Sequence, residues 1–423
     1  MRLFGQDWSQ PKGHQRGTHR SCSPQETLAR LRPLARPLGI TRLANLTGLD
    51  VIGMPVWAAL RPNARGLSSA QGKGLDADCA KVSALMEAIE CWHAEHIKLP
   101  LRCETARMLA RHEAVAALAG LAGFVAPEQL FDSAQNWLQA DDLLSGASCW
   151  LPYDAVSTNY AAPAHSGLLQ SSNGLAGGNH VLEATSHALT ELIERDAVAI
   201  GDAAMRSADA PIRIRPETVD DPHCRQVLAL LERADVRVAL FDLRSDLGIP
   251  VCGATIVDGP GQRAWRTLPA FSGYGCHLSP QIALLRALTE AVQSRLTHIS
   301  GTRDDISPGD YRRGGNPDEL DTLCARLDAQ AAAVDFATLP DLATESFEGD
   351  VSLLLERLRG AGLEQVLVAD LRRPELGVAV VRAVVPGLAA PTSMLRTQGL
   401  RQQRRSNAQP WHAKVSTATR EAA

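Results

Sequence analysis

The sequence has few aromatic residues, no surplus of positive charge and no long apolar run, and each of these deficits excludes a class of function. Phe, Trp and Tyr make up 4% of the 423 residues, too few for the stacking surface that binds single-stranded nucleic acid. The formal net charge is −4, which gives no electrostatic basis for binding nucleic acid. No run approaches the roughly 18 apolar residues that a membrane-spanning helix needs. The sequence therefore predicts a protein that binds neither nucleic acid nor membrane.

The nine cysteines lack the spacing of a metal site or a disulfide framework. They stand singly and no C-x-x-C pair occurs, which argues against a structural zinc or iron–sulfur site. An odd number without framework spacing is typical of reduced thiols in the cytosol. The segment of residues 1–22 is polar and carries no apolar core of a signal peptide. We therefore expect a cytoplasmic protein.

A polar stripe on one predicted helix is the most informative feature that is present. The glycine-rich turn from Asn173 to Gly178 leads directly into a helical pattern that continues to Ala197. Five polar residues in it are spaced by four, four, four and three positions, and so share one helix face. They are Asn179, Glu183, His187, Glu191 and Glu194. Like charges at this spacing repel, and Arg195 is the only full cation nearby, so the stripe calls for a divalent metal ion that carries a polyphosphate.

Two further helical segments carry acidic residues behind small-residue loops. Residues 80–97 contain two glutamates three positions apart, after a loop with one lysine. Residues 279–296 contain an arginine and a glutamate four positions apart. Each set alone is explained by a solvated helix face or a helical salt bridge, but three such helices predict a site where carboxylates converge. The residues concerned are Lys73, Glu87, Glu90, Arg286 and Glu290.

The stretch SNGLAGGNHVLEATSHALTELIERDA resembles the signature of the YcaO superfamily, and the resemblance extends over residues 40–390. Characterised members bind ATP and magnesium without a Walker motif, and they phosphorylate a backbone amide oxygen so that a nucleophile can replace it. The resemblance implies ATP-dependent formation of a thioamide or an azoline in a ribosomally made peptide or protein. It also implies an α+β fold of the YcaO type, in which helices with an acidic Mg-ATP site pack against antiparallel sheets.

The same resemblance assigns roles to individual residues. The implied magnesium ligands are Glu87, Glu90, Glu191, Glu194 and Glu290. The implied nucleotide contacts are Lys73, Asn179, Glu183, Arg195 and Arg286. The E-x-x-E-R end of the signature helix is expected to be catalytic, and it consists of Glu191, Glu194 and Arg195.

The C-terminal segment departs from one branch of the family. Azoline-forming members often end in a proline-rich tail, whereas Pro410 is the only proline in residues 401–423. This difference favours the thioamide branch, in which sulfide replaces the amide oxygen and a TfuA-type partner commonly assists. Since no leader-binding domain is evident, we expect a separate leader-binding protein to recognise the peptide. The oligomeric state is open, and a homodimer is compatible with the resemblance.

The chain is predicted to have three parts. Residues 1–38 are expected to form a flexible arm with one short helix, 39–390 the catalytic domain, and 391–423 a basic, mobile tail. Within the domain, residues 230–259 and 354–387 share the order helix, strand, Asp-Leu-Arg turn, Leu-Gly, strand. This shared order indicates an internal duplication.

Two other functions fit part of the pattern. An accessory protein that keeps the ATP site but assists another modification enzyme would carry the same residues. A metal-dependent hydrolase would combine the glutamates with nearby histidines. These histidines are His93, His96, His180 and His187. The recurring pairs consist of carboxylates, which suit magnesium better than zinc, and we therefore favour amide activation.

Overall fold

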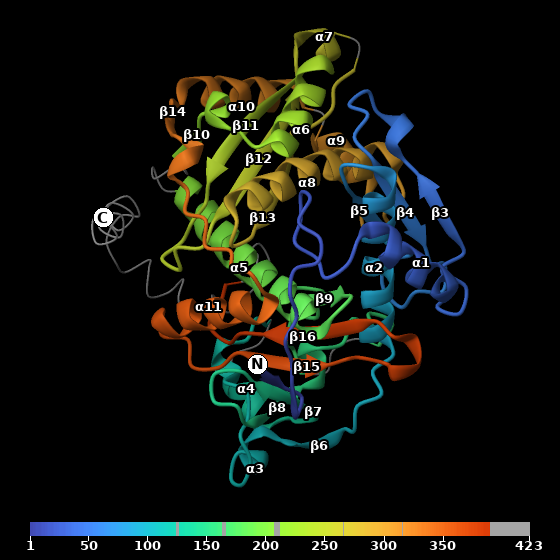
Figure 1. The fold of residues 1–423 in the computed structure, drawn as a ribbon, viewed down its shortest axis with the longest axis vertical. Coiled ribbons are helices and arrows are strands. Elements are labelled where there is room, and N and C mark those ends of the chain that lie inside the picture. The colour runs from blue at the N-terminus through green and yellow to red at the C-terminus, as the bar shows by residue number, and fades with distance from the viewer. Residues whose placement is uncertain (124–126, 163–165, 207–211, 265, 315, 390–423) are drawn as a thin grey trace.

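Helices and antiparallel sheets make up the fold, in agreement with the α+β class expected from the sequence (Figure 1). The structure is a computed structural model. It describes residues 1–123, 127–162, 166–206, 212–264, 266–314 and 316–389. The tail predicted for residues 391–423 lies outside the described residues. None of the helices in the described ranges is long and apolar enough to cross a membrane.

Three sheets hold most of the described strands. The largest has the order β6-β7-β15-β16-β9, with β8 paired to β7, and its neighbours are antiparallel. The second has the order β13-β12-β11-β10-β14, where β10 and β14 run parallel. The third is β3-β4-β5. The strands are β1 Arg2–Leu3, β2 Gln6–Asp7, β3 Arg42–Asn45, β4 Val56–Leu60, β5 Ser69–Lys73, β6 Arg102–Thr105, β7 Ala134–Asp142, β8 Ser148–Pro152, β9 Leu175–Gly178, β10 Ile212–Ile214, β11 Val236–Asp242, β12 Val251–Asp258, β13 Phe271–Cys276, β14 Ala332–Val334, β15 Leu367–Asp370 and β16 Ala379–Val384.

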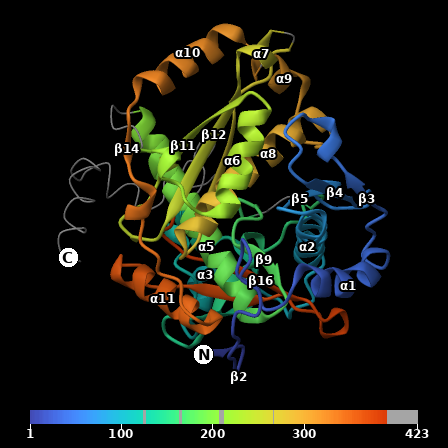
Figure 2. The same ribbon diagram turned by 45° about the horizontal axis from the view of Figure 1, so that its top comes forward.

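Helix α5 lies between the two larger sheets and contacts both β16 and β13, as two views of the ribbon show (Figure 1, Figure 2). Helices α2 and α8 are the other long helices near it. The α-helices are α1 Pro24–Ala35, α2 Ala77–Glu95, α3 Ala106–Leu109, α4 Pro127–Asp132, α5 Val181–Arg206, α6 Pro222–Arg233, α7 Pro260–Arg263, α8 Pro280–Ser300, α9 Pro308–Gly314, α10 Pro317–Ala329 and α11 Phe347–Gly360.

Each of these three long helices follows the edge strand of a sheet, so that the chain forms the strand–helix units β5–α2, β9–α5 and β13–α8. Each helix also contacts the edge strand of the next unit: α2 contacts β9, α5 contacts β13, and α8 contacts β5. The three units thus form a closed ring. One side chain–main chain hydrogen bond joins each helix to the next strand. The bonds are Gly177 N to Glu90 Oε1 (2.6 Å), Cys276 N to Glu194 Oε2 (3.0 Å) and Gln293 Nε2 to Gln71 O (2.6 Å).

Glycines in the edge strands allow the helices to pack closely. A Cβ atom at Gly72 would lie 2.0 Å from the main-chain nitrogen of Ala84, and one at Gly275 would lie 2.1 Å from the carbonyl oxygen of Ala283. A side chain at either position would push the helix away from the strand that precedes it. The glycine-rich segments before the predicted helices therefore include strand residues that set the helix position.

The two segments with similar sequences have the same local structure. In each, a helix is followed by an antiparallel hairpin, α6 by β11–β12 and α11 by β15–β16, which confirms the predicted order of elements. Asp242 and Arg244 form an ion pair at 2.7 Å in the first hairpin, and Asp370 and Arg372 form one at 2.7 Å in the second. The first hairpin lies beside β13 and the second beside β9, so each supports one unit of the ring.

The N-terminal arm, residues 1–23, contacts residues far from it in sequence, and the flexibility expected for residues 1–38 stays a prediction. The Lys12 ammonium is buried and lies 2.8 Å from a carboxylate oxygen of Asp350. Nearer the N-terminus, the main-chain N–H of Phe4 donates to a carboxylate oxygen of Asp141 at 2.6 Å. These partners are far from the arm in sequence, which is why no local pattern indicates the contacts. The arm thus lies across the face of the ring.

A buried ion network anchors α8. The guanidinium of Arg295 is fully buried and donates to Asp50 at 2.8 and 3.2 Å and to Asp258 at 2.7 Å. Arg266 lies 3.3 Å from Asp50 and 3.5 Å from Asp258. The network ties the helix to β12 and to the segment before β4.

Candidate functional site

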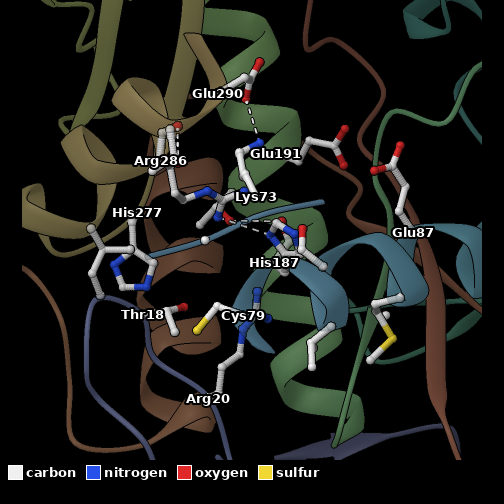
Figure 3. Close-up of a pocket in the computed structure, with 18 of the residues that line it drawn as sticks. Thr18, Arg20, Lys73, Cys79, Glu87, His187, Glu191, His277, Arg286 and Glu290 are labelled. Carbon is white, nitrogen blue, oxygen red and sulfur yellow. Dashed lines mark hydrogen bonds and ion pairs between the residues drawn. The ribbon is translucent and has the colours of Figure 1, made fainter. Parts of the chain in front are cut away.

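A pocket of about 500 Å³ lies where the three helices of the ring meet (Figure 3). Its walls come from α2, α5 and α8, from the strand ends that precede them, and from the N-terminal arm. Every site residue expected from the sequence lines this pocket. These residues are Lys73, Glu87, Glu90, Asn179, Glu183, Glu191, Glu194, Arg195, Arg286 and Glu290. The structure thus brings together three helices that are far apart in the chain. Which metal ion or phosphate group each residue binds stays a prediction.

Several carboxylates lie on one side of the pocket, whereas Glu183 lies beside Arg20 of the N-terminal arm. Figure 3 shows Glu87, Glu191 and Glu290 on one side, and His277 and Arg20 on the other. The close-up also places a lysine between the two groups. This separation of charge suits a ligand that combines metal ions with phosphate oxygens.

Burial raises the pKa values of four pocket carboxyl groups, those of Glu87, Glu90, Glu191 and Glu194. The pKa of Glu87 is raised to about 7 and that of Glu90 to about 8, in both cases mainly by burial and further by neighbouring carboxylates. Burial, followed by the charge of Glu290, raises the pKa of Glu194 to about 7. The carboxylates are therefore only partly ionised near neutral pH without a bound cation, and a divalent ion would stabilise their charged forms.

Two long ion pairs partly offset the negative charge of Glu191 and Glu290. Lys73 Nζ lies 3.6 Å from Glu290 Oε2 and donates to Gln293 Oε1 at 2.8 Å. Arg195 Nη2 lies 4.0 Å from Glu191 Oε1. Both cations line the pocket, so a phosphate group could share them with the glutamates.

Arg286 fixes the protonation of His187. Its Nη1 atom lies 3.2 Å from His187 Nδ1, and because a guanidinium can only donate, Nδ1 must accept. Burial, with the charge of Arg286, lowers the pKa of His187 well below its usual value. The imidazole is therefore neutral with its proton on Nε2. The sequence placed His187 on the polar stripe but gave no sign of this role.

Residues of the N-terminal arm contact the start of α5. Glu183 Oε2 accepts from the main-chain N–H and the hydroxyl of Ser21 at 2.9 and 2.7 Å, and Arg20 Nη1 lies 3.4 Å from Oε1. Asn179 Oδ1 accepts from the Thr27 hydroxyl at 3.1 Å. The two expected nucleotide contacts thus form one wall together with the arm. Sequence analysis missed these arm residues because they follow no helical or strand spacing.

The donor set fits magnesium shared with phosphates. No three His, Cys, Asp or Glu side chains in the described part of the chain are close enough to form a metal-binding group by themselves. Magnesium in nucleotide sites is usually held by one or two carboxylates together with phosphate oxygens and water. The glutamates from the three helices supply such oxygens. The hydrolase alternative would need a compact group of three protein ligands, and the described residues do not provide one.

Three cysteines line the pocket without being activated. They are Cys22, Cys79 and Cys91. Burial, with the charge of Asp76, raises the pKa of Cys79 to about 12, and burial raises that of Cys91 further above its usual value. Since the thiolate is the nucleophilic form, these two thiols are poor nucleophiles. The pocket therefore favours phosphoryl chemistry over covalent catalysis by a thiol.

The raised pKa values predict that the ligand-free protein loses stability as the pH rises. Between the unfolded pKa, near 4.5, and the folded values of about 7 to 8, the folded state binds more protons than the unfolded state. The free energy of unfolding therefore falls across this window, and the loss is complete above about pH 8. Thermal midpoints measured from pH 5 to 8.5 should fall more steeply in the wild type than in Glu87→Gln. Saturating Mg-AMPPCP should restore most of the loss, and equal slopes for the two proteins would contradict the expectation.

Comparison with known proteins finds a match to a family described as binding ATP and Mg²⁺. The family model described as YcaO cyclodehydratase, ATP- and Mg²⁺-binding, matches residues 71–389. A protein described as uncharacterized in the tfuA 3′ region of Rhizobium leguminosarum bv. trifolii is 36% identical over 379 residues, which cover 88% of this chain and 89% of the relative. A relative from Methanothermobacter thermautotrophicus is 34% identical over 370 residues, 86% of this chain and 94% of the relative.

Solved structures show the same fold. The structure of YcaO from Methanopyrus kandleri bound with AMPPCP and Mg²⁺ has a TM-score of 0.73 and 26% sequence identity, and the match covers 90% of this chain and 94% of that chain. A heterocyclase in complex with substrate and cofactor has a TM-score of 0.75 at 22% identity, covering 91% of this chain but 54% of that chain. These matches confirm the family expected from the signature helix: the chain belongs to the YcaO family of ATP- and Mg²⁺-binding proteins.

Proposed function

We propose that this chain uses Mg-ATP to activate a backbone amide of a peptide by O-phosphorylation, so that sulfide replaces the amide oxygen and a thioamide forms. The observation that carries the proposal is the set of six glutamates and two arginines that three helices bring to one pocket, together with Lys73 at the end of β5. An ATP-dependent peptide-modifying enzyme is also what the family match and the heterocyclase fold support.

The chemistry requires activation because an amide oxygen is a poor leaving group. When bound, Mg-ATP supplies the phosphoryl group that allows this oxygen to leave as phosphate. The balance is one C–O bond broken and one C–S bond formed, with hydrosulfide as the sulfur donor and ATP consumed to ADP and phosphate. Such a reaction needs positioning and charge neutralisation from the protein, and no side-chain nucleophile.

The residues of the pocket divide these tasks. Glu87, Glu191 and Glu290 would hold magnesium, while Lys73 and Arg286 would neutralise phosphate oxygens. Glu90 and Glu194 each have one oxygen bonded to the next strand of the ring, which leaves the second oxygen for a ligand. The ring and the metal site thus depend on the same side chains.

A second outcome, azoline formation, differs only in the nucleophile. A Cys, Ser or Thr side chain of the peptide would then attack the amide, as the heterocyclase and cyclodehydratase descriptions of similar proteins suggest. The relative in the tfuA 3′ region and the single proline of residues 401–423 favour the thioamide. We accordingly propose a TfuA-type partner, and a separate leader-binding protein where the peptide carries a leader.

Mass spectrometry distinguishes the two outcomes. Candidate peptides would be incubated with the protein, Mg-ATP, sulfide and a TfuA-type partner. Exchange of oxygen for sulfur adds about 16 Da, whereas cyclodehydration removes about 18 Da, and we expect the first. The control is the Glu191→Gln variant under the same conditions. Binding of Mg-AMPPCP without any change in peptide mass would instead support an accessory role.

A further inference from the structure

Arg382 is a buried cation without a partner in the part of the chain that the structure describes. It lies in β16, its exposed fraction is 4%, and its Nε and Nη1 atoms are buried without a hydrogen-bond partner. Burial lowers the pKa of Arg382 to about 10, although Glu191 and Tyr160 act in the opposite direction. An isolated guanidinium in a protein interior is costly, so its retention calls for an explanation.

Other buried arginines of this chain are paired. The guanidinium of Arg61 binds both carboxylate oxygens of Glu95, and that of Arg295 binds two aspartates. Both are typical buried ion pairs, in which each charge compensates the other. Arg382 differs because its Nε and Nη1 atoms have no hydrogen-bond partner among the described residues, and we therefore look for its partner in a ligand.

The position of Arg382 links it to the acidic side of the pocket. It stands opposite Leu175 of β9 in the strand register, and Leu175 lines the pocket. Among the cations that lower the pKa of Glu191, Arg195 acts most strongly and Arg382 next, before Arg286. Arg382 thus lies on the strand next to β9, and its charge reaches the expected catalytic glutamate, although Arg382 itself is not among the residues that line the acidic pocket.

A second unpaired polar atom belongs to the residue that precedes Tyr160, which feels the charge of Arg382. Asn159 Oδ1 is buried without a hydrogen-bond partner. Its neighbour Tyr160 is 47% exposed, and the pKa of Tyr160, which burial raises, is lowered in part by the charge of Arg382. Guanidinium donors and an amide acceptor in one region suit a peptide, which offers carboxyl oxygens to the first and N–H groups to the second.

We infer that Arg382 is the recognition residue of a second subsite, beside the acidic pocket, that binds a carboxylate of the peptide substrate. A planar carboxylate matches the guanidinium fork and neutralises its charge, which a neutral carbonyl group would not do. A phosphate dianion fits less well, because Glu191 and the other glutamates of the pocket would repel it. The inference rests on the proposed function, since it assigns the subsite to the peptide and not to the nucleotide.

Stability provides the first test. If Arg382 is kept for binding, Arg382→Met removes a buried unpaired charge, and the thermal midpoint of the ligand-free protein should stay the same or rise. A matched change at the other end of the same hairpin, Arg372→Met, removes an arginine that is paired with Asp370. A fall of more than about 5 °C in Arg382→Met alone would show that Arg382 supports the fold, and would overturn the inference.

Small-molecule probes provide the second test. Acetate, acetamide and phosphate would be added at equal concentration and ionic strength to protein saturated with Mg-AMPPCP, and the thermal midpoint measured. Acetate should raise the midpoint of the wild type and of Arg372→Met, but not that of Arg382→Met. No response to acetate in the wild type would overturn the inference. An equal response to acetamide would assign the subsite to a neutral carbonyl group, and an equal response to phosphate would assign it to a phosphate; either would overturn it.

The affinity for the nucleotide separates this inference from the proposed function. By calorimetry, Mg-AMPPCP should bind Arg382→Met and the wild type with dissociation constants within twofold of each other. A loss of tenfold or more in the variant would assign Arg382 to the nucleotide and overturn the peptide subsite. No binding of Mg-AMPPCP to the wild type would contradict the proposed function itself, whatever the response to acetate.

Discussion

The Glu191→Gln variant will lose ATP turnover by roughly 10³-fold or more in the presence of a peptide that the wild type modifies, while the protein stays folded. Glutamine keeps the shape of the side chain and can still accept the N–H of Gly174, which lies 3.2 Å from Glu191 Oε2. The change removes only the negative charge of the carboxylate, and it is this charge that binds magnesium. The measurement is ADP release under saturating ATP, together with the thermal midpoint of the variant.

The control for this prediction is a glutamate outside the pocket. Glu364 is exposed in the segment between α11 and β15, and Glu364→Gln should leave both turnover and thermal midpoint unchanged. If Glu191→Gln turned over ATP as fast as this control, the assignment of the acidic pocket as the catalytic site would be wrong. A large fall in its thermal midpoint would instead point to a structural role for the charge.

The largest loss of stability will follow from replacing Arg295 with methionine. Its guanidinium is fully buried between Asp50 and Asp258, so the substitution leaves two buried carboxylates with only Arg266 near them. Breaking a buried ion pair by removing one partner costs roughly 3–5 kcal/mol. We expect a large fall in the thermal midpoint and in soluble yield. Because α8 also carries Arg286 and Glu290, nucleotide affinity should fall as well.

Two further variants make this second prediction specific. Replacing the two carboxylates as well, as Asp50→Asn, Arg295→Met and Asp258→Asn, should recover part of the loss, because Arg266 is then the one charge left of the network and its side chain is 17% exposed. Arg237→Met removes the arginine of an exposed pair with Asp328 and should have little effect. Equal thermal midpoints for Arg295→Met and Arg237→Met would contradict the importance of the buried network.

The polar stripe of α5 could be predicted because it depends only on the spacing of residues within one helix. Asn179, Glu183 and Glu191 share one face of a single helix by virtue of their spacing alone. The acidic pair of α2 and the arginine–glutamate pair of α8 could be found in the same way. The convergence of the three helices, by contrast, followed from the family resemblance and from the recurrence of the pattern, and spacing could not have supplied it.

Contacts between distant segments could not be predicted. The bond from Gly177 to Glu90 and the contact of Ser21 with Glu183 join residues that no periodicity relates. The arm has a polar sequence typical of flexible segments, and nothing in that sequence indicates the buried ion pair of Lys12 with α11. Arg382 stands in a strand between apolar neighbours, a position that sequence alone would place on a solvated face.

The ring of three strand–helix units also determines when the pocket can form as the chain folds. Within the described residues, β9 has one strand partner, β16, which the chain reaches only after α11. Pairing over such a separation is slow, and a chain emerging from the ribosome cannot complete it until the C-terminal strand is made. A nascent chain that has already produced α2, α5 and α8 therefore still lacks the sheet that positions its central helix. The order of synthesis itself thus delays formation of the complete pocket until the sheet that carries Arg382 is in place.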